Sequence, residues 1–597
     1  MGNLNNTLLG IDLGTTNTVA SFVEDGKPKT IVLESGKRLL PSVVSFKKDG
    51  SLLVGDNAFR QRILNPLDTF YSVKRFIGRQ SANISKNEIS DCKFEIDLSE
   101  DKPKLKSQNV DGLFEVSEIS AQVLLEIKRQ SEKFLDQKIT QCVITVPAYF
   151  DNNQRTATKQ AAEIAGLDVI NLINEPTAAA LAYTKDRSKD GKVLICDLGG
   201  GTFDISLVDQ DLKQNFCEVL ASTGDTKLGG DDFTLEIYKY LINEIKSNNP
   251  NFVLDKKTDI NILDEAEAIK CRLSTENDVE VIFPFLQTSD NKTFSFETNF
   301  SRDNFEFICD KLFNKIEKLL KSFLETHSES VEDLDFVVLV GGSSRIKKFQ
   351  ALIKEITNKD LEVDLNPDEI VSNGAALYAE VSAGTLTKNI VVDLTPLSLG
   401  TAIEGDIFDI VVDANSQIPL REERVYTTTE DGQDAISIDI YQGERLIASE
   451  NTLIGEFILE GIEIANKGDA RIVVIFEIDL NGILTVTAED QKTLVKKNIK
   501  ISNSCEIPLE VIKEMKEKAK LLFNKDSLDI REIQDKLDIR DLIEYQHKLK
   551  LLKQTSEVKE VLLEINSFLE DPSNSTFVCK TLISKARSVI KKQQNIE

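Results

Sequence analysis

The chain has 597 residues, and its 72 Lys and Arg against 99 Asp and Glu give a formal net charge of −27. A surface this acidic argues against a nucleic acid or an anionic membrane as partner, because both attract basic patches. The length allows several domains with buried cores, and no apolar run reaches the roughly 18 residues that a membrane-spanning helix needs.

The hydrophobic pattern changes character twice along the chain. In 1–388, short β-branched runs alternate with helical patterns, which is typical of α/β architecture. In 395–507, short alternating stretches separated by Gly and Asn turns predict a small β-sandwich. From 508 to 597, strand patterns vanish and amphipathic helical patterns take their place. The segment 389–394 connects the first two parts.

Two glycine turns in the α/β part repeat each other. LLGIDLGTTNTVASFVED at 8–25 resembles VLICDLGGGTFDISLVDQ at 193–210, because each has an apolar strand, then Asp, Leu and Gly, then a turn with Thr. Their aspartates, Asp12 and Asp197, lie 197 − 12 = 185 residues apart, which predicts two similar lobes that face each other. A third glycine turn follows a third strand in DFVVLVGGSSRI at 335–346.

These turns predict a site for a nucleoside triphosphate with Mg²⁺ between two lobes. Gly and Thr turns expose successive backbone N–H groups that bind anions, and the hydroxyls of Thr15, Thr16 and Thr202 add donors. Each turn of the repeated pair follows an Asp, and carboxylates beside phosphates normally hold Mg²⁺ through water. The alternative for either motif alone is a plain hairpin turn. The sequence has no P-loop motif.

Motifs along the chain resemble the DnaK-type heat-shock chaperones. GIDLGTTNT, SVKRFIGR, VITVPAYFDNNQR, INEPTAAALAY, DLGGGTFD, VGGSSRI and NPDEIVSNGAA resemble the ATPase domain, and LTPLSLG, IYQGER and IDLNGILTVTAED resemble the peptide-binding domain. The resemblance implies an actin-like, ribonuclease-H-related ATPase domain of two lobes, a β-sandwich peptide-binding domain and an α-helical lid. It also implies an ATP-dependent chaperone that couples hydrolysis to the capture and release of unfolded polypeptides, with ATP or ADP and Mg²⁺ as cofactors.

The resemblance also implies roles for single residues. Asp12 and Asp197 would hold Mg²⁺ through its waters, and Lys74 would direct its ammonium at the γ-phosphate and the attacking water. Glu175 would order water near the metal, and Asp204 would help as an acceptor. Outside their motifs, Lys74 and Glu175 would be ordinary surface charges. The implied catalytic set is Lys74, Glu175, Asp197, Thr202 and Asp204. The implied nucleotide-binding set is Gly14, Thr15, Thr16, Asn17, Gly199, Gly200, Gly201, Thr202, Gly229, Gly230, Asp231, Glu267, Lys270, Ser274, Gly341, Gly342, Ser343, Arg345 and Asp368.

The connecting segment NIVVDL is apolar where linkers between domains are normally polar. By its residues alone, it is either a β-strand or a segment that docks into one domain in one state and is exposed in the other. By resemblance it is a docking linker with an acidic end, and two residues of VPAYFDNNQR relay signals between the lobes and the client domain. The alternative for Pro147 is simply the end of a strand. The implied allosteric set is Pro147, Arg155, Ile390, Val391, Val392 and Asp393.

The resemblance places a peptide groove among loops of the β domain. Its implied lining is Thr401, Ile403, Glu404, Tyr426, Thr429, Gln433, Ala435, Ile436 and Ile438. The arch over a bound peptide is usually apolar or small in the family, whereas this chain has Glu404 and Thr429. An acid at the arch predicts a preference for peptides with basic flanks, and the alternative is that Glu404 points to solvent. Asp231 and Lys347 also depart from the pattern, because Glu and Pro are usual there.

The expected partners are unfolded client polypeptides, a J-domain co-chaperone and a nucleotide exchange factor. The start of the chain has no cationic leader, and the acidic, Gly-rich tail of many relatives is missing, so we expect a cytoplasmic protein of bacterial type. Three alternatives stay open. A small-molecule kinase of the same fold gives no role to 389–597. A non-cycling exchange-factor-like protein does not need Lys74, Glu175 and Thr202. A specialised paralogue, for example in iron–sulfur scaffold delivery, is compatible with the altered arch.

Overall fold

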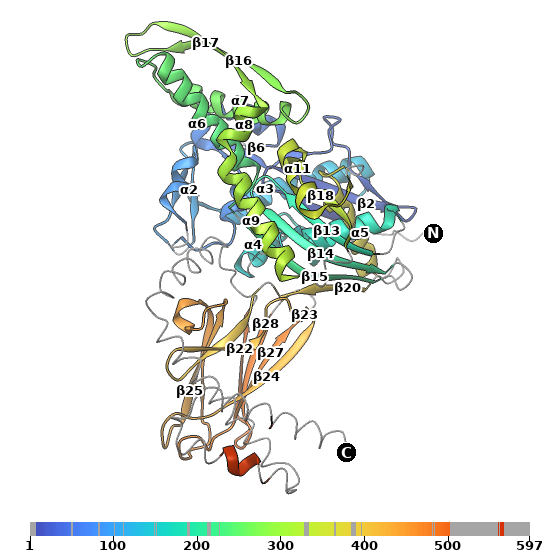
Figure 1. Ribbon diagram of the computed structural model, residues 1–597, viewed down its shortest axis with the longest axis vertical. Coiled ribbons are helices and arrows are strands. Elements are labelled where there is room, and N and C mark those ends of the chain that lie inside the picture. Colours follow the sequence, from blue (N-terminus) through green and yellow to red (C-terminus); the bar gives the residue numbers. More distant parts are fainter. Residues whose placement is uncertain are drawn as a thin grey trace. The chain divides into compact units, whose positions relative to one another are not determined.

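Figure 1 shows a computed structural model of the chain, which describes residues 7–501 with short gaps, together with 559, 561–565 and 585. The gaps are 49–51, 82–83, 101, 111–112, 149, 151, 188–190, 212–215, 226, 328–333, 363–365, 384–389, 396, 480–481 and 483. Contacts divide the chain into two compact units, Met1–Leu509 and Glu510–Glu597. Almost all of the predicted helical segment 508–597 lies outside the described residues, whereas the α/β and β parts belong to the first unit.

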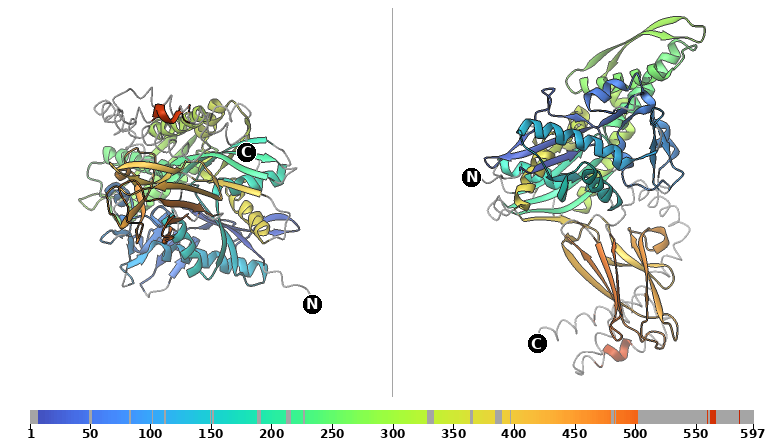
Figure 2. Two further views of the ribbon diagram at one scale, coloured as in Figure 1. Left: turned by 90° about the horizontal axis from the view of Figure 1, so that it is seen from below. Right: turned by 180° about the vertical axis from the view of Figure 1, so that it is seen from behind.

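The first lobe is built on a sheet with the strand order β12-β11-β1-β2-β3, and β4 also pairs with β2. Its central strands are buried because helices cover the sheet, and Figure 2 shows α3 and α4 side by side over it. Two small sheets, β6-β5-β7 and β10-β9-β8, complete the lobe. The strands are β1 (Leu9–Leu13), β2 (Asn17–Glu24), β3 (Lys27–Thr30), β4 (Leu40–Pro41), β5 (Val43–Phe46), β6 (Leu52–Val54), β7 (Thr69–Tyr71), β8 (Glu95–Asp97), β9 (Lys104–Lys106), β10 (Leu113–Glu115), β11 (Gln141–Val146) and β12 (Asp168–Asn174). The helices are α1 (Asp56–Gln61), α2 (Lys86–Asp91), α3 (Val116–Leu135) and α4 (Asn152–Ile164), with the 3₁₀ turns η1 (Pro66–Asp68) and η2 (Val73–Phe76).

The second lobe is built on a sheet with the strand order β19-β18-β13-β14-β15-β20-β23. Helices α6 to α9 pack with it in one hydrophobic core, and the β16–β17 hairpin projects from the α6–α7 end of the lobe (Figure 1). The strands are β13 (Gly191–Leu198), β14 (Phe203–Asp211), β15 (Phe216–Asp225), β16 (Asp278–Gln287), β17 (Thr293–Ser301), β18 (Leu334–Val340), β19 (Leu361–Glu362), β20 (Ile390–Leu394) and β23 (Gln417–Ile418). The helical segments are α5 (Glu175–Arg187), α6 (Gly230–Asn248), α7 (Lys256–Arg272), α8 (Arg302–Ile308), α9 (Asp310–Thr326), η4 (Gly342–Arg345), α11 (Lys347–Thr357) and α12 (Ile370–Ser382).

The internal repeat predicted from the two turns is present in the topology. In the first lobe, β1 lies parallel to β11 on one side and forms an antiparallel hairpin with β2 on the other. In the second lobe, β13 lies parallel to β18 and forms an antiparallel hairpin with β14. Asp12 and Asp197 therefore occupy equivalent places near the ends of the two central strands.

Two helices, α5 and α12, form a shared layer between the lobes, because one buried core takes side chains from both sheets and from both helices. Their small residues allow close approach. A Cβ on Gly374 of α12 would lie 1.7 Å from the carbonyl oxygen of Ala178 in α5, and a Cβ on Gly10 of β1 would lie 2.0 Å from the amide nitrogen of Ala376. These contacts hold α12 against α5 and the first sheet, so α12 couples the lobes.

The β part after the connection consists of two four-stranded antiparallel sheets that share one hydrophobic core. The strand orders are β22-β21-β25-β26 and β24-β27-β28-β29. The strands are β21 (Leu399–Ile403), β22 (Ile407–Val412), β24 (Leu420–Tyr426), β25 (Ala435–Gln442), β26 (Thr452–Glu460), β27 (Ile472–Ile478), β28 (Leu484–Asp490) and β29 (Lys496–Ile501), and a 3₁₀ turn, η5, spans Ala448–Glu450. No helix in the described part of the chain has the length and apolarity to cross a membrane.

Candidate functional site

The glycine turns of the two lobes meet at a cavity of about 380 Å³. Strand ends from both sheets bring its walls together, because β1, β13 and β18 each run into one of the predicted turns. The wall therefore combines residues that are far apart in the sequence. The predicted residues that line it are Asp12, Gly14, Thr15, Thr16, Asn17, Lys74, Glu175, Asp197, Gly199, Gly200, Thr202, Glu267, Lys270, Ser274, Gly341, Gly342, Ser343, Arg345 and Asp368.

Close contacts at the turns explain the glycines at this site. A Cβ on Gly200 would lie 2.1 Å from Thr16 Oγ1, where the turns of the two lobes meet. Gly341 has a φ of +80°, and a Cβ there would lie 2.4 Å from the carbonyl oxygen of Leu198. Larger residues would push these turns apart. These turns therefore bring backbone close to the cavity, and backbone N–H groups there suit an anion such as a phosphate chain.

Five residues of the predicted set do not reach the cavity wall. Gly201 packs against Thr15 and Arg75, and Asp204 lies behind Asp197, its partner in the β13–β14 register. The other three are at the start of α6, where the Gly230 and Asp231 amides donate to the Gly199 and Gly200 carbonyls at 2.9 Å. These hydrogen bonds place them directly against the phosphate-type turn, and their part in the nucleotide site stays a prediction. The five are Gly201, Asp204, Gly229, Gly230 and Asp231.

Buried acids gather at one side of the cavity around one lysine. Lys74 Nζ donates to Glu175 Oε1 at 2.8 Å, and both side chains are almost fully buried. Burial and the nearby Glu175 carboxylate raise the pKa of Asp12 to about 7, against the opposing effect of Lys74 and of a hydrogen bond from Thr145. The same two causes raise the pKa of Asp197 well above its usual range. The negative charge here exceeds what Lys74 neutralises.

Asp204 extends this cluster beneath the cavity. Burial, followed by the Glu175 charge, raises the pKa of Asp204 to about 8, although the Thr202 side chain hydrogen-bonds to it. Its Oδ2 atom is buried and has no hydrogen-bond donor among the described residues. Within the described part of the chain, no three His, Cys, Asp or Glu side chains form a set that could bind a metal ion directly.

The predicted relay residues Pro147 and Arg155 lie next to the acidic cluster. Pro147 is buried directly after β11, and its carbonyl accepts from the Phe150 amide at 3.0 Å. Arg155 Nε donates to the Phe150 carbonyl at 3.1 Å, and its Nη2 donates to the side chain of Asn174, the residue before Glu175. The Phe150 ring in turn lies 5.3 Å from Lys74 Nζ. A continuous set of contacts thus joins the two predicted relay residues to Lys74 and Glu175.

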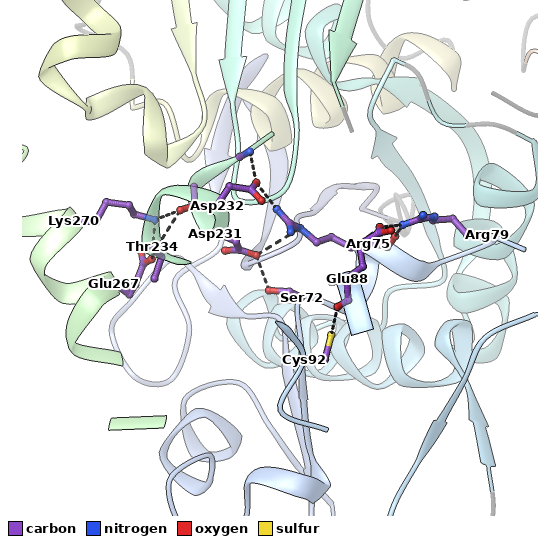
Figure 3. Close-up of polar contacts among 12 residues, drawn as sticks. Ser72, Arg75, Arg79, Glu88, Cys92, Asp231, Asp232, Thr234, Glu267 and Lys270 are labelled. Carbon is purple, nitrogen blue, oxygen red and sulfur yellow. Dashed lines mark hydrogen bonds and ion pairs between the residues drawn. The ribbon is translucent and has the colours of Figure 1, made fainter. Parts of the chain in front are cut away.

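The opposite wall of the cavity carries two ion pairs. Lys270 Nζ lies 2.7 Å from Glu267 Oε2 and donates to the Gly230 carbonyl at 2.9 Å, as Figure 3 shows in part. Burial opposes ionisation of Glu267, but the Lys270 charge and hydrogen bonds outweigh it and lower the pKa of Glu267. Arg345 Nη2 lies 2.8 Å from Asp368 Oδ2. The wall also contains Cys271 and Thr275, which the motif comparison missed although they flank Lys270 and Ser274.

Polar contacts join the two lobes beside the cavity (Figure 3). Ser72 Oγ donates to Asp231 Oδ2 at 2.9 Å, and Arg75 Nη2 donates to Asp232 Oδ2 at 2.8 Å. The Asp231 carboxylate is 3.8 Å from Arg75 Nε, so the shorter acid at this position hydrogen-bonds to serine while its neighbour binds the arginine. Arg75 and Asp232 were not predicted from the sequence, although each adjoins a residue that was.

The predicted connection at 389–394 contains a β-strand. In β20, the backbone of 390–392 pairs in parallel register with β15, and Asp393 and Leu394 pair antiparallel with β23. This strand fits both possibilities that the residues alone left open, since a segment that docks on β15 also forms one. Strand β15 lies next to β14, the strand that follows the Gly199–Thr202 turn.

The residues predicted for the peptide groove gather at one end of the β part. Thr401 and Ile438 are buried, and the remaining apolar and aromatic positions are partly buried. The Tyr426 hydroxyl donates to Asp409 Oδ2 at 2.8 Å, and the Gln433 side chain accepts from the Thr429 amide at 3.0 Å. Glu404 and Thr429 are exposed. The partly buried positions are Ile403, Tyr426, Gln433, Ala435 and Ile436.

Comparisons with known proteins give the family. The Hsp70 protein family model matches residues 8–594. Heat shock 70 kDa protein 6, chloroplastic, from Arabidopsis thaliana is 39% identical over 93% of this chain and 77% of its own length. The chaperone protein dnaK of Gracilaria tenuistipitata var. liui is 39% identical over 89% of this chain and 86% of its own. The chaperone protein DnaK of Prochlorococcus marinus (strain MIT 9515) is 38% identical over 94% and 92%.

The same comparisons correct the expected location. The Arabidopsis thaliana relative and the stromal 70 kDa heat shock-related protein of Pisum sativum, which is also 39% identical, are both chloroplastic by name. The prediction of a bacterial type of cytoplasmic protein was therefore wrong, because it used features of the chain ends that do not separate bacterial from organellar relatives. The resemblance to the DnaK-type chaperones is confirmed over nearly the whole chain, which belongs to the Hsp70 family of ATP-dependent molecular chaperones.

Proposed function

We propose that the chain hydrolyses ATP in the cavity between its two lobes and uses the hydrolysis to capture and release extended polypeptides. The observation that carries the proposal is the buried cluster of Asp12, Lys74, Glu175 and Asp197 in a cavity walled by the glycine turns of both lobes. Family membership supports an actin-like ATPase part that binds ATP or ADP, followed by a substrate-binding part.

The residues at the site fit a nucleoside triphosphate with a divalent cation. The excess negative charge around Lys74 suits a cation, and so does Asp204 Oδ2, to which no described residue donates. Acids whose pKa values burial has raised ionise when a cation arrives. Asp12 and Asp197 would hold Mg²⁺ through water, and Mg²⁺ would neutralise charge on the β- and γ-phosphates. The turns at 14–17 and 199–202 would hold the phosphates, with no room for a side chain on Gly200.

The other wall of the cavity suits the nucleoside. Glu267, Lys270 and Ser274 would bind the ribose side, and the planar guanidinium of Arg345 would stack on the base. Asp368 holds that guanidinium in place at 2.8 Å. Gly341, Gly342 and Ser343 complete this wall.

For hydrolysis, the chain would supply positioning and charge, because phosphoryl transfer to water needs little else from a protein. Glu175 holds the Lys74 ammonium, and the Phe150 ring covers it, so its charge acts in a medium with little water. Lys74 would direct that charge at the transferring phosphoryl group and the attacking water. Thr202 would orient the water, and Asp204, which reaches the cavity through its hydrogen bond with Thr202, would hold the released proton.

Coupling would run through the connection between the parts. Strand β20 pairs with β15, and β14 separates β15 from β13, the strand that carries Asp197. A movement of the Gly199–Thr202 turn would therefore be transmitted to β20 through β14 and β15, which lie between β13 and β20 in one sheet. Pro147 and Arg155 would act at the same site from the other lobe, through Phe150 and Asn174.

We assign a separate function to each of the predicted parts of the chain. Residues 1–388 would form the ATPase domain, 389–394 the allosteric linker, 395–507 a β-sandwich peptide-binding domain and 508–597 a helical lid. The proposed partners are unfolded or extended client polypeptides, a J-domain co-chaperone and a nucleotide exchange factor. A dedicated role with narrow clients is a second candidate, which the polar residues Glu404 and Thr429 favour because both are exposed at the groove.

The test is a single-turnover ATPase assay with and without Mg²⁺ and with and without a short apolar peptide. We expect hydrolysis that requires Mg²⁺ and that becomes faster when a peptide binds. Transfer of the phosphoryl group to a small-molecule acceptor in place of water would support a kinase instead. A hydrolysis rate that changes neither with Mg²⁺ nor with peptide would contradict the proposal.

A further inference from the structure

Two chain segments flank the end of the β part where two strands diverge. One is the turn 404–406 between β21 and β22, and the other is the loop 427–434 between β24 and β25. Backbone pairing between β21 and β25 stops at Thr401 and Ile440, although both strands continue toward this end. The open interval lets an extended peptide add backbone hydrogen bonds to a strand edge. The two segments are therefore the two sides of the proposed peptide groove.

The turn 404–406 is fixed to the body of the β part. The Ala448 amide donates to the Asp406 carbonyl at 2.9 Å, and the Ser449 amide donates to Asp406 Oδ1 at 3.0 Å. Glu404 thus projects from a turn that has its own support on one side of the groove.

The loop 427–434 has a separate support. The Gly432 amide donates to the Ala465 carbonyl at 2.9 Å, and the Lys467 amide donates to Asp431 Oδ1 at 2.7 Å. The backbone of Lys467 is therefore fixed to the side of the groove opposite Glu404.

The side chains of these two residues meet across the groove. Lys467 Nζ lies 3.6 Å from Glu404 Oε2, and the exposed fractions of the two side chains are 56% and 69%. Since each residue is fixed by its backbone to a different side, the ion pair spans the opening. This contact also changes the expectation for Glu404, because a carboxylate that Lys467 neutralises attracts basic peptide flanks less.

We propose that Glu404 and Lys467 form an ionic clasp that slows the escape of a bound peptide. The proposal rests on the proposed function, in that it requires a peptide in this groove. An exposed ion pair contributes modestly and is screened by salt. The clasp would therefore retain peptides better at low ionic strength and would loosen as the salt concentration rises, whatever the charge of the peptide.

The experiment measures the dissociation rate of an uncharged fluorescent peptide from the full chain with ADP, at about 20 mM and about 1 M NaCl. The variants are Glu404→Lys, Lys467→Glu and the double exchange of both. At low salt we expect each single variant to release the peptide up to about fivefold faster, the effect of one exposed ion pair. The double exchange should restore slow release. At high salt, the peptide dissociation rates of the wild type and the three variants should become equal.

A matched control is Glu477→Lys, which removes a comparable exposed pair with Arg421, 3.4 Å long, at the far end of β24 from the groove. It should release peptide at the wild-type rate. A double exchange that releases as fast as the single variants, or single variants that release at the wild-type rate, would overturn the clasp alone. A wild-type chain that binds no peptide at either salt concentration would overturn the proposed function together with it.

Discussion

Replacing Lys74 with Met removes the cation at the centre of the buried acidic cluster. Its charge opposes the raised pKa values of Asp12, Asp197 and Asp204, and its ammonium lies 2.8 Å from Glu175. Loss of a charge that stabilises the transition state costs on the order of 10²–10³ in rate, about 3–4 kcal/mol. We expect a hydrolysis rate lower by at least that factor, with ATP still bound because many other residues line the cavity. Rapid-quench single-turnover kinetics measures the rate, and nucleotide titration measures the binding.

A second variant separates chemistry from stability. Lys74→Met leaves the Glu175 carboxylate buried without its partner, which costs about 3–5 kcal/mol of folding free energy. Adding Glu175→Gln removes that charge, so the double variant should regain much of the stability lost while its hydrolysis stays slow. Thermal unfolding without nucleotide provides the comparison. Single-turnover hydrolysis within about twofold of wild type in Lys74→Met would refute the assigned role.

Three further predictions concern the contacts around the site. Arg75→Ala should speed ADP release several-fold in stopped-flow measurements, because it removes the 2.8 Å contact with Asp232 between the lobes, and an unchanged rate would refute that role. Gly200→Ala should weaken ATP binding more than tenfold by titration calorimetry, about 1.4 kcal/mol, since its Cβ would meet Thr16 Oγ1 at 2.1 Å; wild-type affinity would contradict the close approach. Paired Asp substitutions at 391 and 392 should leave basal hydrolysis intact but abolish ATP-triggered peptide release, because Asp disfavours the strand β20. Normal release in this variant would exclude β20 as the allosteric linker.

Local patterns were sufficient to predict the two central turns. A buried strand, an Asp and a Gly-Thr turn form within about ten residues, so Asp12 and Asp197 could be placed without knowing the rest of the fold. The repeat then predicted two lobes, and the structure has equivalent strand arrangements around both aspartates. The apolar run in the connecting segment likewise predicted a possible strand, and the segment contains β20.

Contacts between distant segments could not be predicted in this way. Arg75 and Asp232 are 157 positions apart, and no local pattern indicates that they pair. Gly229 and Gly230 were predicted as part of the nucleotide site, but that α6 begins directly against the Gly199–Gly200 turn is visible only in the structure. A polar residue can line a cavity or can contact another residue that lines it, and which of the two occurs depends on how the helices and strands pack.

The same limit applies at the peptide groove. The departure of Glu404 from the family pattern was evident from the residue type alone, but its partner Lys467 lies in another loop. The hydrogen bonds that fix this loop to 427–434 bring the two charges together, and they depend on the register of four strands.

In the proposed function, the nucleotide in the cavity between the lobes controls peptide binding in the β part. Stopped-flow fluorescence of a labelled peptide, bound to the full chain with ADP and then mixed with ATP and Mg²⁺ or with ADP and Mg²⁺, tests it most directly. We predict release at least about tenfold faster with ATP, a difference of about 1.4 kcal/mol in the barrier. Equal release rates with the two nucleotides, in a chain that binds both, would contradict it.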